Sequence, residues 1–441
     1  MSRLAAALAR RRALFARIRA EREAVIAYLR QEFPQDEAFL GQAAEEVRAV
    51  TVVLGSPRGG TSVFKQVLGS APGAVALPGE HRWLFTLLGL NHPDHGDMDE
   101  CAGSIPLDTS QRTFLLDNLL FECRGEQIAE PSRRDWERYA WDWALRLKLQ
   151  WPDLVDGPAE DLVAVVRDRL CGGLTGPEPA FDVLDAVRAH GVPVDPFQYD
   201  LDETLVHSYF PGLPLPSGPP GRTIVEISPF LALRPCHRPR LDLPRTVLVL
   251  KASSDAYRIP LIHDLFTGWD ICELHLTRNP LASVNGLIDG WQHRSFWQHD
   301  LSVHGQAAGS RPDWNFDLCD DWQKLASGDL AELAASQWSC PHRRILNQAK
   351  SPVMLRFEDF QAGGLGRRAL MDHAAHVSGL HFDDAAWETA KHPRLVNSTA
   401  APAVARWRTS RPHLRELLAL PHVAATTEAL GYDTRDWARW P

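Results

Sequence analysis

The chain lacks an excess of positive charge, long apolar runs and closely spaced cysteines, and each absence excludes a class of protein. Its 441 residues include 47 Lys and Arg against 56 Asp and Glu, a formal net charge of −9. A general nucleic-acid-binding protein carries a net basic face that neutralises phosphates. We therefore expect no nucleic-acid partner, although a local basic pocket is compatible with this charge.

No apolar run approaches the roughly 18 residues that span a membrane, so we expect no membrane span. The first apolar stretch, six residues long, precedes three arginines, which is unlike a secretory signal. The seven cysteines have neither the short spacing of a zinc or redox motif nor an even count for complete disulfide pairing. These features predict a soluble, cytoplasmic protein with reduced cysteines.

The composition that remains is typical of a globular chain, with 44% hydrophobic and 23% charged residues. Residues 2 to about 31 carry apolar side chains at helical spacings, which place them on one face of a helix. These side chains are Leu4, Leu8, Phe15, Ile18, Val25 and Leu29. A basic amphipathic helix can lie on a membrane surface. We favour the commoner arrangement, in which the apolar face packs on its own domain or on a second subunit of a homo-oligomer.

Short β-branched and apolar runs recur along the chain between segments of helical pattern. They are TVVL (51–54), AVAL (74–77), TIVEI (223–227), TVLVL (246–250), ELHLT (273–277) and VMLRF (353–357). Buried strands separated by helices predict a parallel sheet with helices on both faces. Between Glu80 and Thr223 the pattern is mainly helical, with helices predicted at 115–123, 136–149 and 162–171. We interpret this stretch as an insertion that caps the functional site.

The segment GSPRGGTS (55–62) lies between the first predicted strand and a helix, where a phosphate-binding loop belongs. Glycines let backbone N–H groups face an anion, and the helix N-terminus adds partial positive charge. The spacing of Gly55 and Gly60 matches a nucleotide-triphosphatase loop, but Thr61 stands where that loop needs a lysine for the β- and γ-phosphates. The loop therefore predicts a terminal phosphate or sulfonate, held by Arg58 and backbone amides, rather than a triphosphate with magnesium.

The same segment resembles the phosphosulfate-binding loop of sulfotransferases that use 3′-phosphoadenosine 5′-phosphosulfate (PAPS). The resemblance implies that the donor is held by Ser56, Arg58, Gly59, Gly60, Thr61 and Ser62. Residues 276–284 (LTRNPLASV) resemble the second motif of the family, whose arginine binds the 3′-phosphate. That role falls to Arg278 and suits the planar fork of a guanidinium group. The family serine eight residues later is Gly286 here, and Ser283 or Asn285 is the candidate substitute.

Two further segments resemble the family. Lys251 ends a predicted strand, like the family lysine that approaches the transferred sulfuryl group, but Ser253 replaces the proline expected two residues later. Residues 397–408 (NSTAAPAVARWR) resemble the C-terminal cofactor segment of Golgi-type and bacterial members. This implies donor contacts from Ser398, Thr399, Arg406 and Trp407.

Sulfuryl transfer, like phosphoryl transfer, needs charge stabilisation and a group that accepts the proton of the acceptor. Arg58 and Lys251 can stabilise the charge. Glu80 follows the second predicted strand, where Golgi-type and several bacterial members carry a catalytic glutamate, so the resemblance implies that Glu80 is the base. His81 is the alternative base by its pKa alone. Either residue could instead interact with a helix N-terminus.

The stretch from 290 to 340 is rich in histidine and tryptophan. His293, His299 and His304 have spacings that do not share one helix face, so we expect no metal site. The tryptophans are expected in the core, with an apolar acceptor pocket as the alternative. The acidic residues Asp94, Asp97, Asp99 and Glu100 lack the spacing of a calcium loop.

Together these features predict an α/β fold with a P-loop NTPase-like parallel sheet. The predicted parts are N-terminal amphipathic helices (1–48), a sulfotransferase core (49–80 and 223–441) and a helical insertion (81–222). The predicted reaction moves the sulfuryl group of PAPS to a hydroxyl, less readily an amine, of a small-molecule, glycan or lipid acceptor. It releases 3′-phosphoadenosine 5′-phosphate (PAP) and requires no metal. An ATP-dependent phosphotransferase and a non-catalytic PAP-binding protein are the alternatives.

Overall fold

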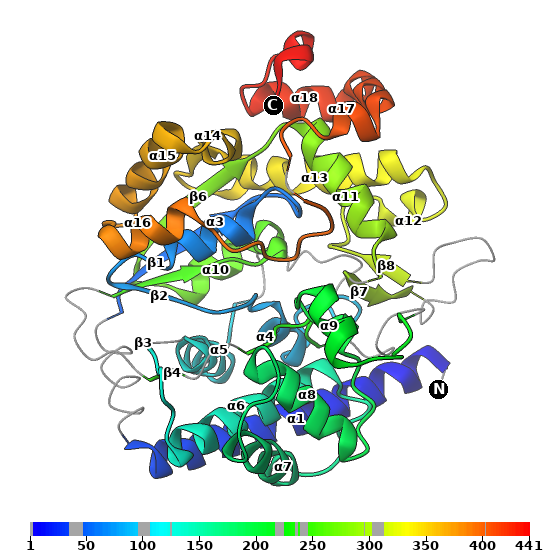
Figure 1. Cartoon of the computed structure of the whole chain (residues 1–441). Coiled ribbons are helices and arrows are strands. Elements are labelled where there is room, and N and C mark those ends of the chain that lie inside the picture. Colours follow the sequence, from blue (N-terminus) through cyan, green and yellow to red (C-terminus); the bar gives the residue numbers. More distant parts are fainter. Residues whose placement is uncertain are drawn as a thin grey trace.

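Five short strands form a parallel sheet in the middle of the fold (Figure 1). Their spatial order is β2 (Ala74–Ala76), β5 (Val247–Leu250), β1 (Ala49–Leu54), β6 (Asp270–Thr277) and β9 (Val353–Arg356). The α/β fold with a parallel sheet is therefore confirmed. The computed structural model describes residues 3–34, 47–95, 106–123, 126–216, 225–233, 237–238, 246–294, 296–301, 313–401 and 403–441.

The central strand β1 is buried on both faces, which explains its continuous apolar sequence. Val50 and Val52 belong to one hydrophobic core, whereas Ala49 and Val53 belong to another. Successive side chains of a strand point to opposite faces, so helices cover the sheet on both sides. Hydrogen-bond registers such as Ala49 with Val247 of β5 and with Asp270 of β6 fix the neighbouring strands.

Helices cover the sheet and extend beyond its β6–β9 edge. One face packs against α3 (Thr61–Leu68), α14 (Phe357–Ala362), α15 (Gly364–Val377) and α16 (Asp384–Lys391). The helix α10 (Ile259–Leu265) belongs to the core of the other face. A third cluster joins α11 (Pro280–Gln292), α13 (Leu330–Gln348), α17 (Trp407–Ser410), η4 (Pro412–Ala419) and α18 (Pro421–Ala429). The minor elements are β3 (Glu126–Gln127), β4 (His237–Arg238), β7 (Trp297–Asp300), β8 (Asp313–Asn315), α12 (Trp322–Leu325), η1 (Pro196–Gln198), η2 (Ser253–Tyr257) and η5 (Thr434–Arg439).

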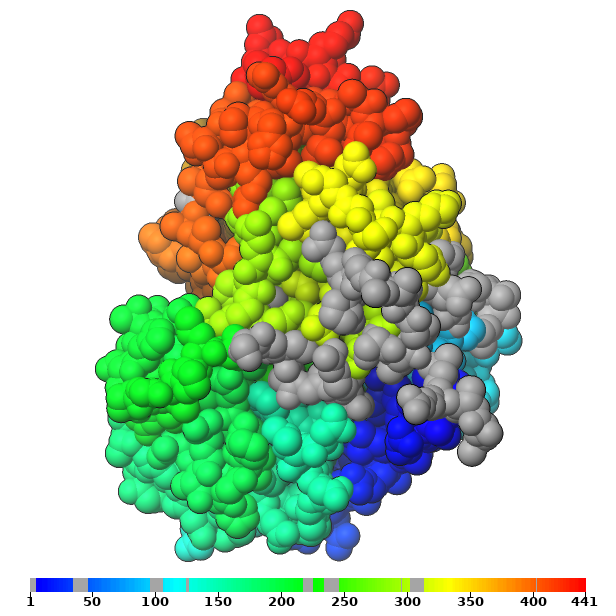
Figure 2. Space-filling model, turned by 90° about the vertical axis from the view of Figure 1, so that its right-hand side faces the viewer, coloured from blue at the N-terminus to red at the C-terminus, as the bar shows by residue number. Residues whose placement is uncertain are grey.

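The described residues between 82 and 209 are mainly helical, as predicted. They form α4 (Arg82–Leu87), α5 (Thr109–Glu122), α6 (Arg133–Gln150), α7 (Ala159–Cys171), α8 (Pro179–Ala189) and α9 (Glu203–Tyr209). Their apolar side chains share one core with β1 and β5, so this part is packed onto the sheet. Figure 2 shows this helical part and the C-terminal residues at opposite ends of the molecule. The role of 81–222 as a cap stays a prediction.

The N-terminal stretch forms one helix, α1 (Arg3–Glu32), as predicted, and Leu8 of the predicted apolar face is only half-buried. Phe15, Ile18, Val25 and Leu29 are at most 6% exposed and belong to the core that α4, α5 and α6 share. The apolar face of α1 therefore packs on its own chain. A homo-oligomer contact through this helix stays a prediction.

Five of the six predicted strands are confirmed, and the prediction at 223–227 is wrong for its described residues, 225–227. This segment makes its hydrogen bonds with the helical part instead of the sheet. The N–H of Glu226 donates to the Leu149 carbonyl at 3.1 Å, and the N–H of Phe230 donates to the Gln198 carbonyl at 2.7 Å. The run at 223–227 resembled a strand because it is apolar. An apolar run of this length occurs in buried loops as well as in strands.

The tryptophan-rich stretch contributes to the core, as expected. Trp314, Trp322 and Trp338 are at most 2% exposed. Within the ranges described above, no helix has the length and apolarity that crossing a membrane requires. The described cysteines, Cys123, Cys171, Cys272, Cys319 and Cys340, have free thiols.

Candidate active site

A cavity of about 850 Å³ lies at the carboxyl ends of β1, β2, β5 and β6. Parallel strands bring their carboxyl ends to one edge of a sheet, where ligands of α/β folds bind. The residues that follow these strands and line the cavity are Arg58, Gly60, Thr61, Ser62, Glu80, Lys251 and Arg278. The sheet thus brings together predicted site residues that are far apart in the sequence.

The loop after β1 needs both of its outer glycines. A Cβ on Gly55 would lie 2.7 Å from the Leu276 carbonyl oxygen, and a Cβ on Gly60 would lie 2.3 Å from the Phe357 ring. Gly60 also has a φ of +90° and precedes α3, whose N-terminus no described side chain caps. The first N–H groups of α3 are therefore available to an anion at the cavity.

Ser56 and Gly59 contribute to the loop in a different way. Both are buried in the turn, where the N–H of Gly59 donates to the Ser56 carbonyl at 3.1 Å, and neither lines the cavity. They therefore shape the loop, and Thr61 and Ser62 are the loop hydroxyl residues that reach the cavity.

Lys251 and Glu80 form an ion pair in the wall of the cavity, with side chains 5% and 21% exposed. They meet because β2 and β5 are paired in parallel, with Ala76 opposite Val249. The Nζ atom of Lys251 also donates to Ser62 Oγ at 3.1 Å. The second oxygen of Glu80, Oε2, accepts from the N–H of Ser253 at 3.3 Å. The arrangement places a cation and a carboxylate beside the start of α3.

His81 does not line the cavity. Its Nε2 atom lies 3.0 Å from Asp255 Oδ1, and the two side chains are 2% and 0% exposed. Adjacent residues of the chain thus point to different surroundings, Glu80 to the cavity and His81 to the interior. The geometry favours Glu80 over His81 as a base.

Lys65 is a site residue that the sequence reasoning missed. It lies one helical turn after Thr61 on α3, is 6% exposed and lines the cavity. Its Nζ atom donates to the carbonyl oxygens of Leu77 and Gly79, at 2.5 and 3.2 Å. Burial, assisted by the nearby Lys251 ammonium, lowers the pKa of Lys65 to about 8. The four-residue spacing from the loop was the signal that could have identified it.

Arg278 follows β6 and lines the cavity. Its Nη1 donates to the Arg58 carbonyl at 3.2 Å, and its buried Nε has no hydrogen-bond partner among the described residues. Burial lowers the pKa of Arg278, an effect that the Glu358 carboxylate opposes. Buried polar groups are normally hydrogen-bonded, so an unpartnered guanidinium N–H at a cavity points to a ligand.

Neither candidate substitute for the family serine stands in its place. Ser283 is 0% exposed and does not line the cavity. Asn285 does line it, but its Oδ1 accepts from Ser410 Oγ at 2.8 Å and from Arg411 Nη1 at 2.7 Å. At the position of the family serine, Gly286 lines the cavity without a side-chain hydroxyl.

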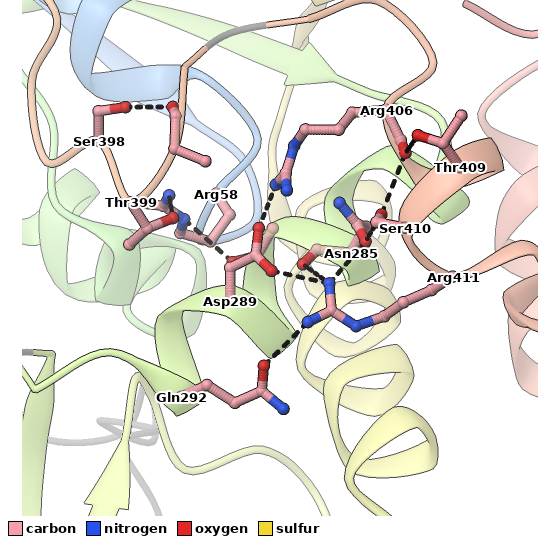
Figure 3. Close-up of polar contacts among 12 residues, drawn as sticks. Arg58, Asn285, Asp289, Gln292, Ser398, Thr399, Arg406, Thr409, Ser410 and Arg411 are labelled. Carbon is pink, nitrogen blue, oxygen red and sulfur yellow. Dashed lines mark hydrogen bonds and ion pairs between the residues drawn. The ribbon is translucent and has the colours of Figure 1, made fainter.

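The C-terminal segment (393–407) runs along the cavity and is fixed to α11 (Figure 3). Asp289 of α11 accepts from Arg406 and, at 2.7 Å, from Nη1 of Arg411. Trp407 is 1% exposed, lines the cavity, and leaves its Nε1 without a partner in the described structure. Pro402, part of the predicted segment, lies outside the described residues.

Ser398 and Thr399 lie on the same segment and line the cavity. The hydroxyl of Ser398 donates to the Ala400 carbonyl at 2.7 Å, whereas Thr399 Oγ1 accepts from Arg58 Nη2 at 2.9 Å (Figure 3). Burial first, and then the nearby Arg278 and Arg406, lower the pKa of Arg58 to about 10, while Asp289 acts to raise it.

The described residues contain no group of three or more His, Cys, Asp or Glu side chains placed to hold a metal ion. Four residues considered in that context lie outside the described ranges: Asp97, Asp99, Glu100 and His304.

Comparison with known proteins gives two similar solved structures. No protein-family model and no curated protein matches the chain. The sulfotransferase domain from the Synechococcus PCC 7002 olefin synthase is 14% identical, with 88% of this chain and 96% of that chain covered and a TM-score of 0.33. The sulfotransferase domain from the curacin biosynthetic pathway is 10% identical, with 88% and 99% covered and a TM-score of 0.34. Both similar structures are sulfotransferase domains by name.

Proposed function

We propose that this chain is a sulfotransferase that uses PAPS as the donor and a hydroxyl group as the acceptor. The observation that carries the proposal is the Lys251–Glu80 ion pair beside Ser62, at the start of α3 and in one cavity with Arg278. A cation and an uncapped helix N-terminus suit the transferred anionic group, and the carboxylate suits the acceptor proton.

The residues in the cavity fit the donor. Arg278 offers a buried, unpartnered N–H, and Trp407 offers an unpartnered indole N–H among the described residues. Arg278, Thr399, Arg406 and Trp407 would hold the nucleotide, and the start of α3 with Ser62 and Lys251 would hold the sulfuryl end. When bound, PAPS supplies an activated sulfuryl group attached to a phosphate leaving group.

The protein groups have separate tasks in the proposed reaction. Lys251 holds positive charge next to the helix N-terminus, where negative charge develops during the transfer. Glu80 accepts the proton of the acceptor hydroxyl, while the N–H of Ser253 orients its Oε2. Lys65 holds the Leu77–Gly79 turn that carries Glu80.

Leu231 lies near the turn before Glu80, since a Cβ built on Gly79 would be 3.4 Å from Leu231 Cδ2. Trp83, Ile227, Pro229 and Ala232 also line the cavity, together with the polar residues Glu226, Ser228 and Gln298. A lining that combines apolar side chains with a few polar groups suits an acceptor whose hydroxyl is attached to an apolar body.

Binding of PAP against ATP with magnesium tests the nucleotide. Because Thr61 stands in place of the triphosphate lysine, PAP should bind and ATP with magnesium should bind poorly. At about 100 times its Kd, PAP should stabilise the fold by about 2.7 kcal/mol, measured as a rise in Tm. Tighter binding of ATP than of PAP in calorimetry would favour a phosphotransferase.

The Glu80→Gln variant tests the chemistry. Losing a general base should lower kcat about 10²- to 10⁴-fold and leave PAP affinity unchanged. The substrates come from a screen of hydroxyl acceptors with labelled PAPS. His81→Gln is the matched control, expected to lower Tm through its buried Asp255 contact while the folded enzyme keeps its kcat. Normal turnover by Glu80→Gln contradicts the assignment, and PAP binding without turnover of any acceptor by the wild type indicates a non-catalytic protein.

A further inference from the structure

Arg58 has a backbone conformation that usually belongs to glycine. Its φ is +62°, in the left-handed region that non-glycine residues rarely adopt. The loop around it already contains glycines where close approach requires them, at Gly55 and Gly60. A strained arginine at a cavity indicates that its side chain, rather than its backbone, is needed there.

The Arg58 side chain occupies the space beside Gly286 of α11. A Cβ on Gly286 would lie 3.3 Å from Arg58 Cβ and 3.8 Å from Arg58 Nε. The Nε atom donates to the Gly286 carbonyl at 3.3 Å. A serine at position 286 would crowd Arg58. The glycine at this position, which lacks the family hydroxyl, thus leaves the space that the Arg58 side chain occupies.

Three arginines line this part of the cavity: Arg58, Arg278 and Arg406. The Nη1 atom of Arg278 donates to the Arg58 carbonyl at 3.2 Å, and Arg406 pairs with Asp289, three residues after Gly286 on α11. Asp289 pairs with Arg406 and with Arg411. Among the described residues neither Arg58 nor Arg278 forms an ion pair with a carboxylate, so their charges suit an anionic ligand.

Arg58 also has unused hydrogen-bond donors. Its guanidinium has five N–H groups. Two of them are directed at the carbonyls of Gly286 and Asn397, and a third at Thr399 Oγ1. In the described structure two N–H groups remain for a ligand. The guanidinium contacts α11 and the C-terminal segment, whereas the Lys251–Glu80 pair lies at the ends of β5 and β2.

We propose that Arg58 recognises the 3′-phosphate of the donor, in place of a hydroxyl on α11 and together with Arg278 and Arg406. This rests on the proposed use of PAPS. It also changes the role predicted for Arg58 from the loop, because the guanidinium lies with the 3′-phosphate arginine and not with the groups that handle the sulfuryl end.

The test compares PAP with adenosine 5′-monophosphate, which differs from PAP only in the missing 3′-phosphate. Calorimetry gives the Kd of each nucleotide for the wild type and for Arg58→Met, Arg58→Lys and Arg435→Met. We expect the wild type to prefer PAP at least 100-fold. Arg58→Met should lower this preference at least 10-fold with the monophosphate Kd unchanged, and Arg58→Lys should lower it less. Arg435→Met is the control, because exposed Arg435 pairs with Asp433 at 3.0 Å and does not line the cavity.

Gly286→Ser supplies an independent readout. In the wild-type background it should weaken PAP binding by crowding Arg58, whereas in the Arg58→Met background it should restore part of the preference for PAP. An equal loss for both nucleotides in Arg58→Met and Arg58→Lys, or no loss, overturns the proposal. Failure of Gly286→Ser to restore any preference also counts against it. If the wild type binds neither nucleotide, it is the proposed function that fails.

Discussion

At the scale of single residues, Lys65 shows how a buried charge can position the proposed base. Its ammonium holds the turn of Leu77 and Gly79, and the next residue is Glu80. A lysine 6% exposed beside a second ammonium, Lys251, is unfavourable for the fold, which its lowered pKa expresses. Burying the Lys65 ammonium destabilises the fold, but the ammonium holds the turn that precedes Glu80. We therefore assign Lys65 a positioning role in the site.

The lowered pKa of Lys65 predicts a specific pH dependence of stability. Its pKa is about 8 in the folded protein and 10.5 ordinarily, so between these values the unfolded chain binds the proton and the folded chain does not. The contribution of Lys65 to the free energy of unfolding is therefore fully present above pH 10.5, decreases as pH falls from 10.5 to 8, and is lost below pH 8. Between pH 8 and pH 10.5 the free energy of unfolding should change by about 3 kcal/mol through this residue.

Urea unfolding of the wild type and of Lys65→Met at several pH values measures this contribution. Groups that titrate in both proteins cancel in the difference between their free energies of unfolding. The wild type should gain stability relative to Lys65→Met as pH rises from 8 to 10.5. A constant difference would mean that the folded protein leaves the pKa of Lys65 unchanged.

At the scale of elements, α11 is the platform that fixes the C-terminal segment. Asn285, Asp289 and Gln292 share one helix face by their spacing of four and three residues. They accept hydrogen bonds from Ser410, Arg406 and Arg411 (Figure 3). The C-terminal segment that lines the cavity is thus held by the helix that follows Arg278.

Asp289→Asn should loosen the C-terminal segment. The substitution removes the negative charge that Arg406 and Arg411 share and leaves two guanidinium groups that repel each other. Amides of 393–411 should exchange with solvent at least 10-fold faster, and PAP should bind more weakly. Hydrogen-exchange mass spectrometry measures the first effect. Gln292→Ala is the control, because exposed Gln292 contacts only Arg411 among these groups, and equal exchange in both variants would contradict the role of Asp289.

At the scale of the whole molecule, the helical part and the sheet share one hydrophobic core. That core includes side chains from α1, from α5 to α8 and from β1 and β5. A buried charge network crosses it, in which Glu122 of α5 pairs with Arg22 of α1 and Arg146 of α6, all at most 3% exposed. A shared core predicts that these parts unfold together.

Thermal unfolding should therefore show one transition, with the helical part and the sheet melting together. Glu122→Gln leaves the two arginines without their shared partner, so it should destabilise the fold by about 3–5 kcal/mol and shift the entire transition. Calorimetry of both proteins, with the PAP Kd measured below the transition, tests this. Two separated transitions, only one of them moved by the substitution, would show that residues 81–222 fold independently.

Local pattern was sufficient to predict five strands of the sheet, and the resemblance to sulfotransferase motifs singled out Glu80, Lys251 and Arg278. These three residues lie together because each follows a parallel strand, and the ends of parallel strands meet at the ligand-binding edge. Lys65 was missed because a lysine on a helix is normally solvated. Its four-residue spacing from Thr61 indicates a shared helix face, but only the tertiary structure brings the Leu77 and Gly79 carbonyls to its ammonium.

The sequence by itself therefore determined the parallel sheet, the phosphate loop and the positions of the strand-end side chains, since these depend on residues close together in the chain. Only the tertiary structure decided which way those side chains point. His81 faces Asp255 because the chain turns into α4, and Arg58 extends over Gly286 because α11 leaves room for it there. Such directions depend on contacts between residues up to hundreds of positions apart, such as Arg58 with Thr399, and packing rather than local preference sets them.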